Sequence, residues 1–193
     1  MQKLDRSKLW SLEQYATERP AFRAAVIAHK KRRQLPLNDH ATLYFEDFTT
    51  MKYQVQEMLR VERIFEPDQI EEEIEAYNPL IPDGANWKAT FMIEYPDVEE
   101  RRRALQVLGG IEHRVWTCIG HRPRTFSIAN EDLDRSTGEK TAAVHFMRFE
   151  LDAASIEELR SGATLTFGID HDLMRCEVNV EGEIRTALLA DLD

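Results

Sequence analysis

The sequence predicts an α+β protein, in which a helical N-terminal half packs on a mainly antiparallel sheet formed by the C-terminal half. Up to residue 77, apolar side chains recur every three or four positions, which is the spacing of an amphipathic helix. From residue 78 onward, apolar and polar residues alternate in short runs, which is the spacing of a strand. No low-complexity stretch divides the 193 residues, so we expect a single domain over residues 1–193.

Each helix of the N-terminal half is expected where an apolar stripe follows a residue that can cap or start a helix. Proline suits a first helical turn, because its missing N–H would have no partner there. The predicted helices begin, in order, at Asp5 or Ser7, at Pro20, at residue 45 and at Pro67. The second of them is expected to end at residues 35–38, which contain another proline.

The C-terminal half is expected to contain more strands than helices. The stretch Pro82-Asp83-Gly84 predicts a turn between the halves, because proline presets φ and glycine tolerates positive φ. Strands are predicted at residues 88–95, 114–119, 124–128, 141–151, 163–169 and 175–180. Helices are predicted from Asp97 to Leu108, from Asp152 to Gly162 and over residues 183–192.

The overall charge and the missing motifs argue against several classes of protein. A net charge of −10 argues against a nucleic-acid-binding protein, whose affinity depends on cationic contacts to phosphate. There is no nucleotide motif, and two cysteines are too few for an iron–sulfur cluster of the protein's own. No run of about 18 apolar residues occurs, so we expect a cytoplasmic protein without a membrane span.

The predicted helix over residues 45–65 carries polar residues beside its apolar face. On a helical wheel, Asp47, Gln54 and Glu57 form an arc that borders the apolar arc. Two carboxylates and an amide there could bind a metal ion or position a proton donor. They could equally cap the helix and pair with arginines. The arc predicted to face the core contains Met51, Val55, Met58, Leu59 and Phe65, and the arc predicted to face solvent contains Lys52, Gln56, Arg60 and Arg63.

The predicted strand over residues 141–151 places a histidine on an apolar face. His145 alternates with Met147 and Phe149, and a hydrogen-bonded core histidine is more common in such a position than a ligand. Arg148 lies on the other face with Glu150 and can pair with it. We expect Glu57 of the preceding helical half to meet this strand, with either Arg148 or a metal ion as its partner.

The segment GIDHD follows the predicted strand over residues 163–169. Asp170, His171 and Asp172 are expected in a loop, and carboxylate and imidazole neighbours are a common metal-binding or acid–base combination. Adjacent residues of an extended chain point apart, however, so the three side chains need a turn to face one ion.

Six stretches of the sequence together resemble one known family. They are, in chain order, HKKRR, FEDFTTMKYQVQEMLR, EAYNPLIPDG, EERRRAL, AVHFMRFEL and GIDHD. Over nearly the whole chain, they resemble an uncharacterised bacterial family designated domain of unknown function 3501. The family offers no catalytic residue to transfer. Its members are often encoded beside rubrerythrin-like di-iron proteins and cluster-binding oxidoreductase subunits, so the resemblance implies a link to redox or peroxide-stress chemistry.

Three hypotheses of different classes follow. The first is an accessory or interaction protein that docks through its acidic surface on a redox protein partner. The second is a metal-dependent or acid–base enzyme acting on a small molecule, with iron, manganese or zinc as the metal. In the third, the polar motif residues serve folding alone. The candidate site residues are Glu46, Asp47, Gln54, Glu57, His145, Arg148, Asp170 and His171, of which Glu57, His145 and His171 are the candidate metal ligands.

Overall fold

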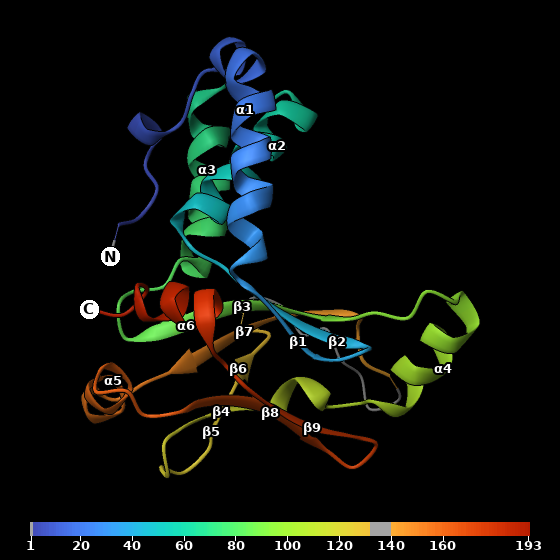
Figure 1. The fold of residues 1–193 in the computed structure, drawn as a ribbon. Helices are drawn as coiled ribbons and strands as arrows, with labels where there is room; N and C mark the ends of the chain where they lie inside the picture. The colour runs from blue at the N-terminus through green and yellow to red at the C-terminus, as the bar shows by residue number, and fades with distance from the viewer. Residues whose placement is uncertain (1, 132–139) are drawn as a thin grey trace.

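A bundle of three helices and two antiparallel sheets form three layers in the part of the chain that the structure describes, residues 2–131 and 140–193 of a computed structural model (Figure 1). The bundle rises from one side of a five-stranded sheet, and a four-stranded sheet covers the other side. The predicted α+β class is therefore confirmed. The bundle helices are α1 (Leu12–Lys31), α2 (Phe48–Glu62) and α3 (Pro67–Tyr77).

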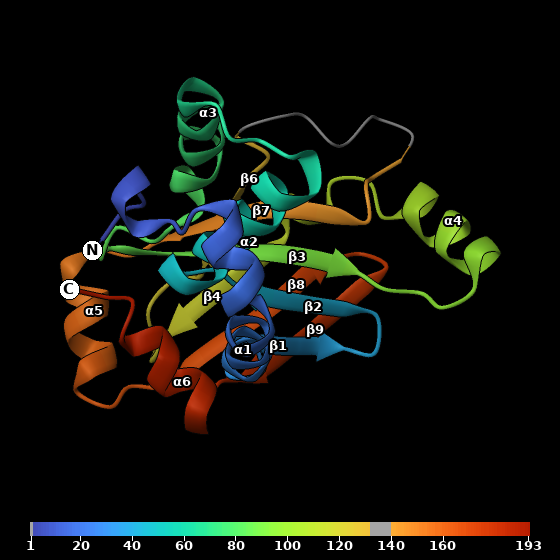
Figure 2. The same ribbon diagram turned by 90° about the horizontal axis from the view of Figure 1, so that it is seen from above.

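The remaining helices lie around the margins of the sheets, as the view from above shows (Figure 2). Two of them begin at the residues that the sequence predicted as caps, because the side chains of Asp97 and Asp152 accept backbone N–H groups of their first turns. The helices are α4 (Val98–Val107), α5 (Ala153–Arg160) and α6 (Gly182–Leu189), with short 3₁₀ turns η1 (Arg6–Lys8), η2 (Asn78–Leu80) and η3 (Ile111–His113).

The strands form two sheets rather than the single predicted sheet, and two strands come from the N-terminal half. The five-stranded sheet has the order β1 (Gln34–Asn38), β2 (Ala41–Phe45), β3 (Asn86–Ile93), β7 (Val144–Glu150) and β6 (Ile128–Ala129). The four-stranded sheet has the order β5 (Thr125–Phe126), β4 (Val115–Ile119), β8 (Leu165–His171) and β9 (Met174–Asn179). The antiparallel pairing of β4 with β5 joins two strands that the sequence predicted, at residues 114–119 and 124–128.

The main core lies between the two sheets. Phe167 of β8 packs its ring against Phe45 and Phe149 of the facing sheet, at centroid distances of 5.2 Å for both. The ring of Trp87 lies 5.6 Å from Phe167, and its indole N–H donates to the carbonyl of Leu188. These contacts hold the two sheets together and fix α6 to β3.

Two corrections concern prolines that were predicted to bound helices. Pro20 does not start a helix but lies inside α1, whose cap is Ser11 rather than Asp5 or Ser7. Pro20 and Ala16 are both exposed, so the carbonyl that loses its N–H partner there can bond to water. Pro36 does not end a helix but lies in β1, an edge strand, where a missing N–H removes no bond that the sheet needs.

The bundle has a core of its own, in which α2 packs against α1 and α3. Met51, Val55 and Leu59 are buried as predicted. Phe65 lies beyond the end of α2 and is 68% exposed, so its place in the predicted apolar arc was wrong. Gln56 was predicted to face solvent but is fully buried, because its side chain accepts the backbone N–H of Trp10 and donates to the carbonyl of the same residue.

Candidate functional site

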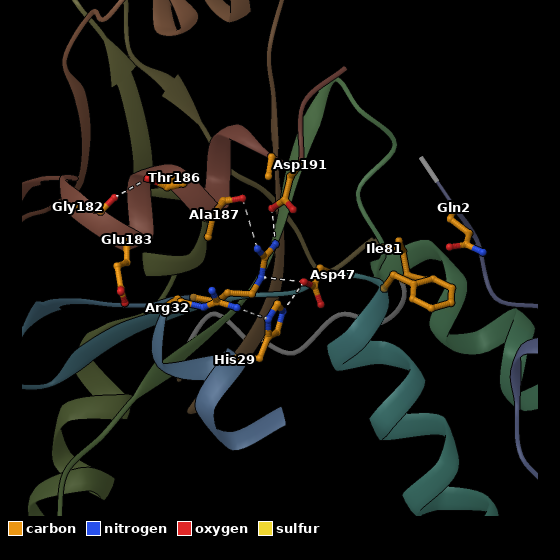
Figure 3. A pocket seen from close by; sticks show the side chains of 13 residues that line it. Gln2, His29, Arg32, Asp47, Ile81, Gly182, Glu183, Thr186, Ala187 and Asp191 are labelled. Carbon is orange, nitrogen blue, oxygen red and sulfur yellow. Dashed lines mark hydrogen bonds and ion pairs between the residues drawn. The ribbon is translucent and has the colours of Figure 1, made fainter. Parts of the chain in front are cut away.

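A cavity of about 840 Å³ lies where α1 ends, α2 begins and α6 passes beside them. Its walls combine charged side chains with a larger apolar part, and the charged groups are drawn in Figure 3. The lining includes His29, Arg32, Arg33, Asp47, Phe48 and Asp191. The close-up shows that His29 and Arg32 come from the last turn of α1 and its end, whereas Asp47 stands opposite to them at the start of α2.

Asp47 is held in place because it caps α2. One carboxylate oxygen, Oδ1, accepts the backbone N–H of Thr50 at 2.9 Å, and the Thr50 hydroxyl oxygen accepts the N–H of Asp47 at the same distance. This capping box fixes the rotamer of Asp47. The other oxygen, Oδ2, lies 2.6 Å from Nε2 of His29 and 3.4 Å from Nε of Arg33. One side chain therefore starts the helix and orients an imidazole.

The two neighbours of the His29 ring determine which nitrogen carries the proton in the neutral form. A guanidinium can only donate hydrogen bonds, and Nη2 of Arg32 lies 3.2 Å from Nδ1 of His29. Nδ1 is therefore the acceptor, and Nε2 donates its N–H to Asp47. A carboxylate in this position stabilises the imidazolium that forms when Nδ1 takes up a proton.

Arg33 forms the buried base of the site. Its guanidinium is 3% exposed and contacts the carboxylate of Asp191, which follows α6. It also donates to the carbonyls of Phe45 at 3.2 Å and Glu46 at 3.3 Å, which end β2. Burial raises the pKa of Asp191 to about 6, although Arg33 beside it acts in the opposite direction. Arg33 therefore links α1, β2 and α6.

Of the eight residues predicted for a site, only Asp47 lines this cavity. Glu46 is buried at the end of β2, where it accepts the hydroxyl of Thr90 at 2.7 Å. Gln54 is half-buried on α2. Neither Glu46 nor Gln54 lines the cavity.

The prediction that Glu57 meets the strand carrying His145 and Arg148 was wrong. The partners of Glu57 come from α1: Arg19 binds both carboxylate oxygens, at 2.7 and 2.8 Å, and the hydroxyl of Tyr15 donates at 2.6 Å. The hydrogen bond from Arg19 is the main reason why the pKa of Glu57 is lowered to about 2, against desolvation by burial. The wheel correctly placed Glu57 at the edge of the core, but α1 covers that edge.

His145 is a buried, hydrogen-bonded residue of the core side of β7, as the alternation predicted. Its ring nitrogens contact the hydroxyl of Thr141 at 2.8 Å and the side-chain oxygen of Asn130 at 3.1 Å. The buried carboxylate of Glu112 lies 4.0 Å from Nε2 and accepts the Thr141 hydroxyl. These contacts connect β7 to η3.

Arg148 pairs with Glu150, as the sequence predicted, and also with Glu131. Asp170 and His171 do not lie in a loop, because β8 continues through both of them and pairs with β9. Asp170 contacts Arg124 and Arg175 at 3.6 Å each. The structure therefore distributes the predicted residues over several places.

The residues predicted as metal ligands are not brought together. Among residues 2–131 and 140–193, no three His, Cys, Asp or Glu side chains lie close enough to hold a metal ion. Each has a different partner: Arg19 for Glu57, Thr141 for His145 and the backbone N–H of Leu173 for His171.

Sequence reasoning missed His29, Arg33 and Asp191 as site residues. One signal was available for His29, because the residue continues the stripe of Phe22 and Val26 on its helix, where a polar side chain is unusual. The hydrogen bond between His29 and Asp47 depends on how α1 and α2 pack together. The periodicity of the sequence contains no information about that packing.

The fold and the site together define an α+β protein with a charged cavity at the base of its helical bundle. The chain belongs to the family described as "Protein of unknown function (DUF3501)", whose profile matches residues 3–192. It is also similar to a protein of unknown function from Burkholderia pseudomallei K96243, known from a crystal structure, with 46% identity, full coverage of both chains and a TM-score of 0.93. No curated protein matches.

Each described helix falls short of the combination of length and apolar composition that a membrane crossing requires.

Proposed function

We propose that the protein binds a small organic acid in the cavity between α1, α2 and α6 and that His29 exchanges a proton with it. The observation that carries this proposal is the position of the His29 ring between Asp47 and Arg32 in the cavity wall. An imidazole oriented by a carboxylate is a common general base, because the carboxylate stabilises its charged form.

The guanidinium of Arg32 favours an anionic ligand, although Asp47, Glu183 and Asp191 also line the cavity. Arg33 already has the carboxylates of Asp191 and Asp47. Arg32 is exposed, and among the described residues its guanidinium forms no ion pair with a carboxylate. A carboxylate or phosphate group of a ligand would supply that partner, with the fork geometry that arginine offers. The apolar part of the wall, which includes Phe48, suits the body of an organic molecule.

Ligand binding and proton transfer are connected through Arg32. When its N–H groups turn to the anionic group of a ligand, Nδ1 of His29 loses its present donor and becomes free to accept a proton. That proton would come from the carbon beside the anionic group and would return to the ligand at the end of the reaction. Asp47 keeps its hydrogen bond to Nε2 throughout and offsets the positive charge on the ring.

The role as an accessory partner in redox or peroxide-stress metabolism stays a prediction. It depends on the family setting and on no contact within the described residues. Binding of an organic acid at His29 is compatible with such a setting and does not require it.

A ligand screen with matched variants tests binding. We expect at least one compound from a panel of small mono- and dicarboxylates and phosphomonoesters to raise the thermal midpoint and to bind in calorimetric titration. Arg32→Gln should weaken that compound about tenfold or more, because a charge-assisted pair is lost. Arg23→Gln is the control, since Arg23 is an exposed arginine of the same helix outside the cavity. Binding by neither protein, or equal binding by wild type and Arg32→Gln, would contradict the proposal.

Hydrogen–deuterium exchange of the bound compound tests the role of His29. We expect the wild type to exchange the carbon-bound hydrogen beside the anionic group with solvent deuterium, and His29→Gln to slow this about 10²- to 10⁴-fold. Titration of the same compound shows whether His29→Gln still binds it, which separates proton transfer from binding.

A further inference from the structure

A groove of about 340 Å³ lies at the far end of the helical bundle, where α1 and α3 begin and α2 ends (Figure 1). The proposed acid-binding cavity lies at the other end of α1, about 30 Å away along a helix of 20 residues. We call this second hollow the tip groove. Its apolar lining consists of Leu9, Trp10, Leu12, Leu59, Ile64, Phe65 and Ile70.

A large aromatic side chain of the tip groove is exposed to solvent. Phe65 in the groove lining is 68% exposed, whereas Leu59, which also lines the groove, is 2% exposed. An exposed aromatic side chain in a hydrophobic lining is the arrangement of an interaction anchor, because a partner side chain can complete the packing.

The chain segment that contains Ile64, Phe65 and Ile70 of the tip groove is acidic. Residues 60–75, which end α2 and form most of α3, include seven carboxylates against two arginines. Glu66, which follows Phe65 in the chain, and Asp68 are exposed, and the charged lining residues of the groove are Glu13 and Arg6. A cationic partner bound at the tip groove would be attracted by this excess of carboxylates.

We propose that the tip groove docks a basic amphipathic segment of a partner protein, in which lysines or arginines flank an apolar side chain that packs on Phe65. The charge complementarity identifies this occupant, and the net charge of −10 adds long-range attraction for a cationic partner. A second copy of the chain suits the surface less, because a twofold contact would place one acidic segment against another.

A designed peptide pair tests the proposal on the full chain. The first peptide is an amphipathic helix of about 14 residues, or four turns, made of lysine and leucine, and the second has glutamate in place of lysine. Fluorescence anisotropy measures both affinities at about 0.05 and 0.3 M salt. The variant is Phe65→Ser, and the control is Leu173→Ser, because Leu173 is 65% exposed in the turn between β8 and β9.

We expect the lysine peptide to bind, to weaken at the higher salt concentration and to lose about tenfold in affinity with Phe65→Ser. Leu173→Ser should bind like the wild type, and the glutamate peptide should not bind. The proposal is overturned if the lysine peptide does not bind, if Phe65→Ser leaves its affinity unchanged or if the glutamate peptide binds equally well. A concentration-dependent dimer that Phe65→Ser abolishes would also overturn it, in favour of a second copy of the chain.

Discussion

Replacing Arg33 with methionine is expected to lower the free energy of unfolding by about 3–5 kcal/mol, because removing one partner of a buried ion pair leaves an uncompensated charge. The buried carboxylate of Asp191 would lose its cation, and the carbonyls of Phe45 and Glu46 would lose a donor. Urea denaturation at neutral pH measures the change.

Two further variants isolate the buried charge as the cause. Arg32→Met, at the exposed neighbouring arginine, should change the free energy of unfolding by less than about 0.5 kcal/mol. The double variant Arg33→Met/Asp191→Leu should recover most of the loss, since a buried pair can be replaced by apolar residues at little cost. A loss below about 1 kcal/mol in Arg33→Met would show that the pair is not the link between α1 and α6 that the structure indicates.

Replacing Glu57 with glutamine is expected to cost about 2–3 kcal/mol at neutral pH and almost nothing near pH 2. The pKa of Glu57 falls from its usual value of 4.5 to about 2 in the folded protein, so ionised Glu57 stabilises the fold above pH 4.5. That stabilisation disappears as the pH falls from 4.5 through 2. Solvent screening limits the loss, because the Glu57 and Arg19 side chains are 19% and 29% exposed.

The measurement is urea denaturation of wild type and Glu57→Gln at several pH values between 7 and the acid limit of folding. Glu62→Gln is the matched control, since Glu62 is an exposed carboxylate at the end of the same helix. Its free energy of unfolding should follow that of the wild type at every pH within about 0.5 kcal/mol. Parallel curves for wild type and Glu57→Gln across the acid range would show that Arg19 and Tyr15 do not stabilise the charge.

Local patterns predicted most of the elements, and the errors have physical causes. Proline carries the same backbone restrictions wherever it occurs, but their cost depends on the surroundings. Pro20 is tolerated because its side of α1 faces water, and Pro36 because β1 is an edge strand. Neither surrounding is visible in a window of neighbouring residues.

The candidate site was less predictable because its residues meet through tertiary contacts. The helical wheel showed that Glu57 borders the core, but it could not show that α1 rather than β7 covers this border. His29 and Asp47 are 18 positions apart and meet only because α1 ends where α2 begins. Arg33 and Asp191 are separated by nearly the whole chain. The family resemblance included His29 and Arg33 in HKKRR but did not indicate their partners.

The tautomer of His29 tests the central claim most directly. The proposed acid–base role requires that Nδ1 carries no hydrogen when the ring is neutral. A long-range ¹H–¹⁵N correlation spectrum of protein with labelled histidine identifies the protonated nitrogen of the neutral ring. We expect the hydrogen on Nε2, which donates to Asp47, and no hydrogen on Nδ1. The ¹⁵N signal of Nδ1 should shift when the best-binding acid is added. A neutral ring with its hydrogen on Nδ1, or an Nδ1 signal that does not respond to the bound acid, would contradict the account.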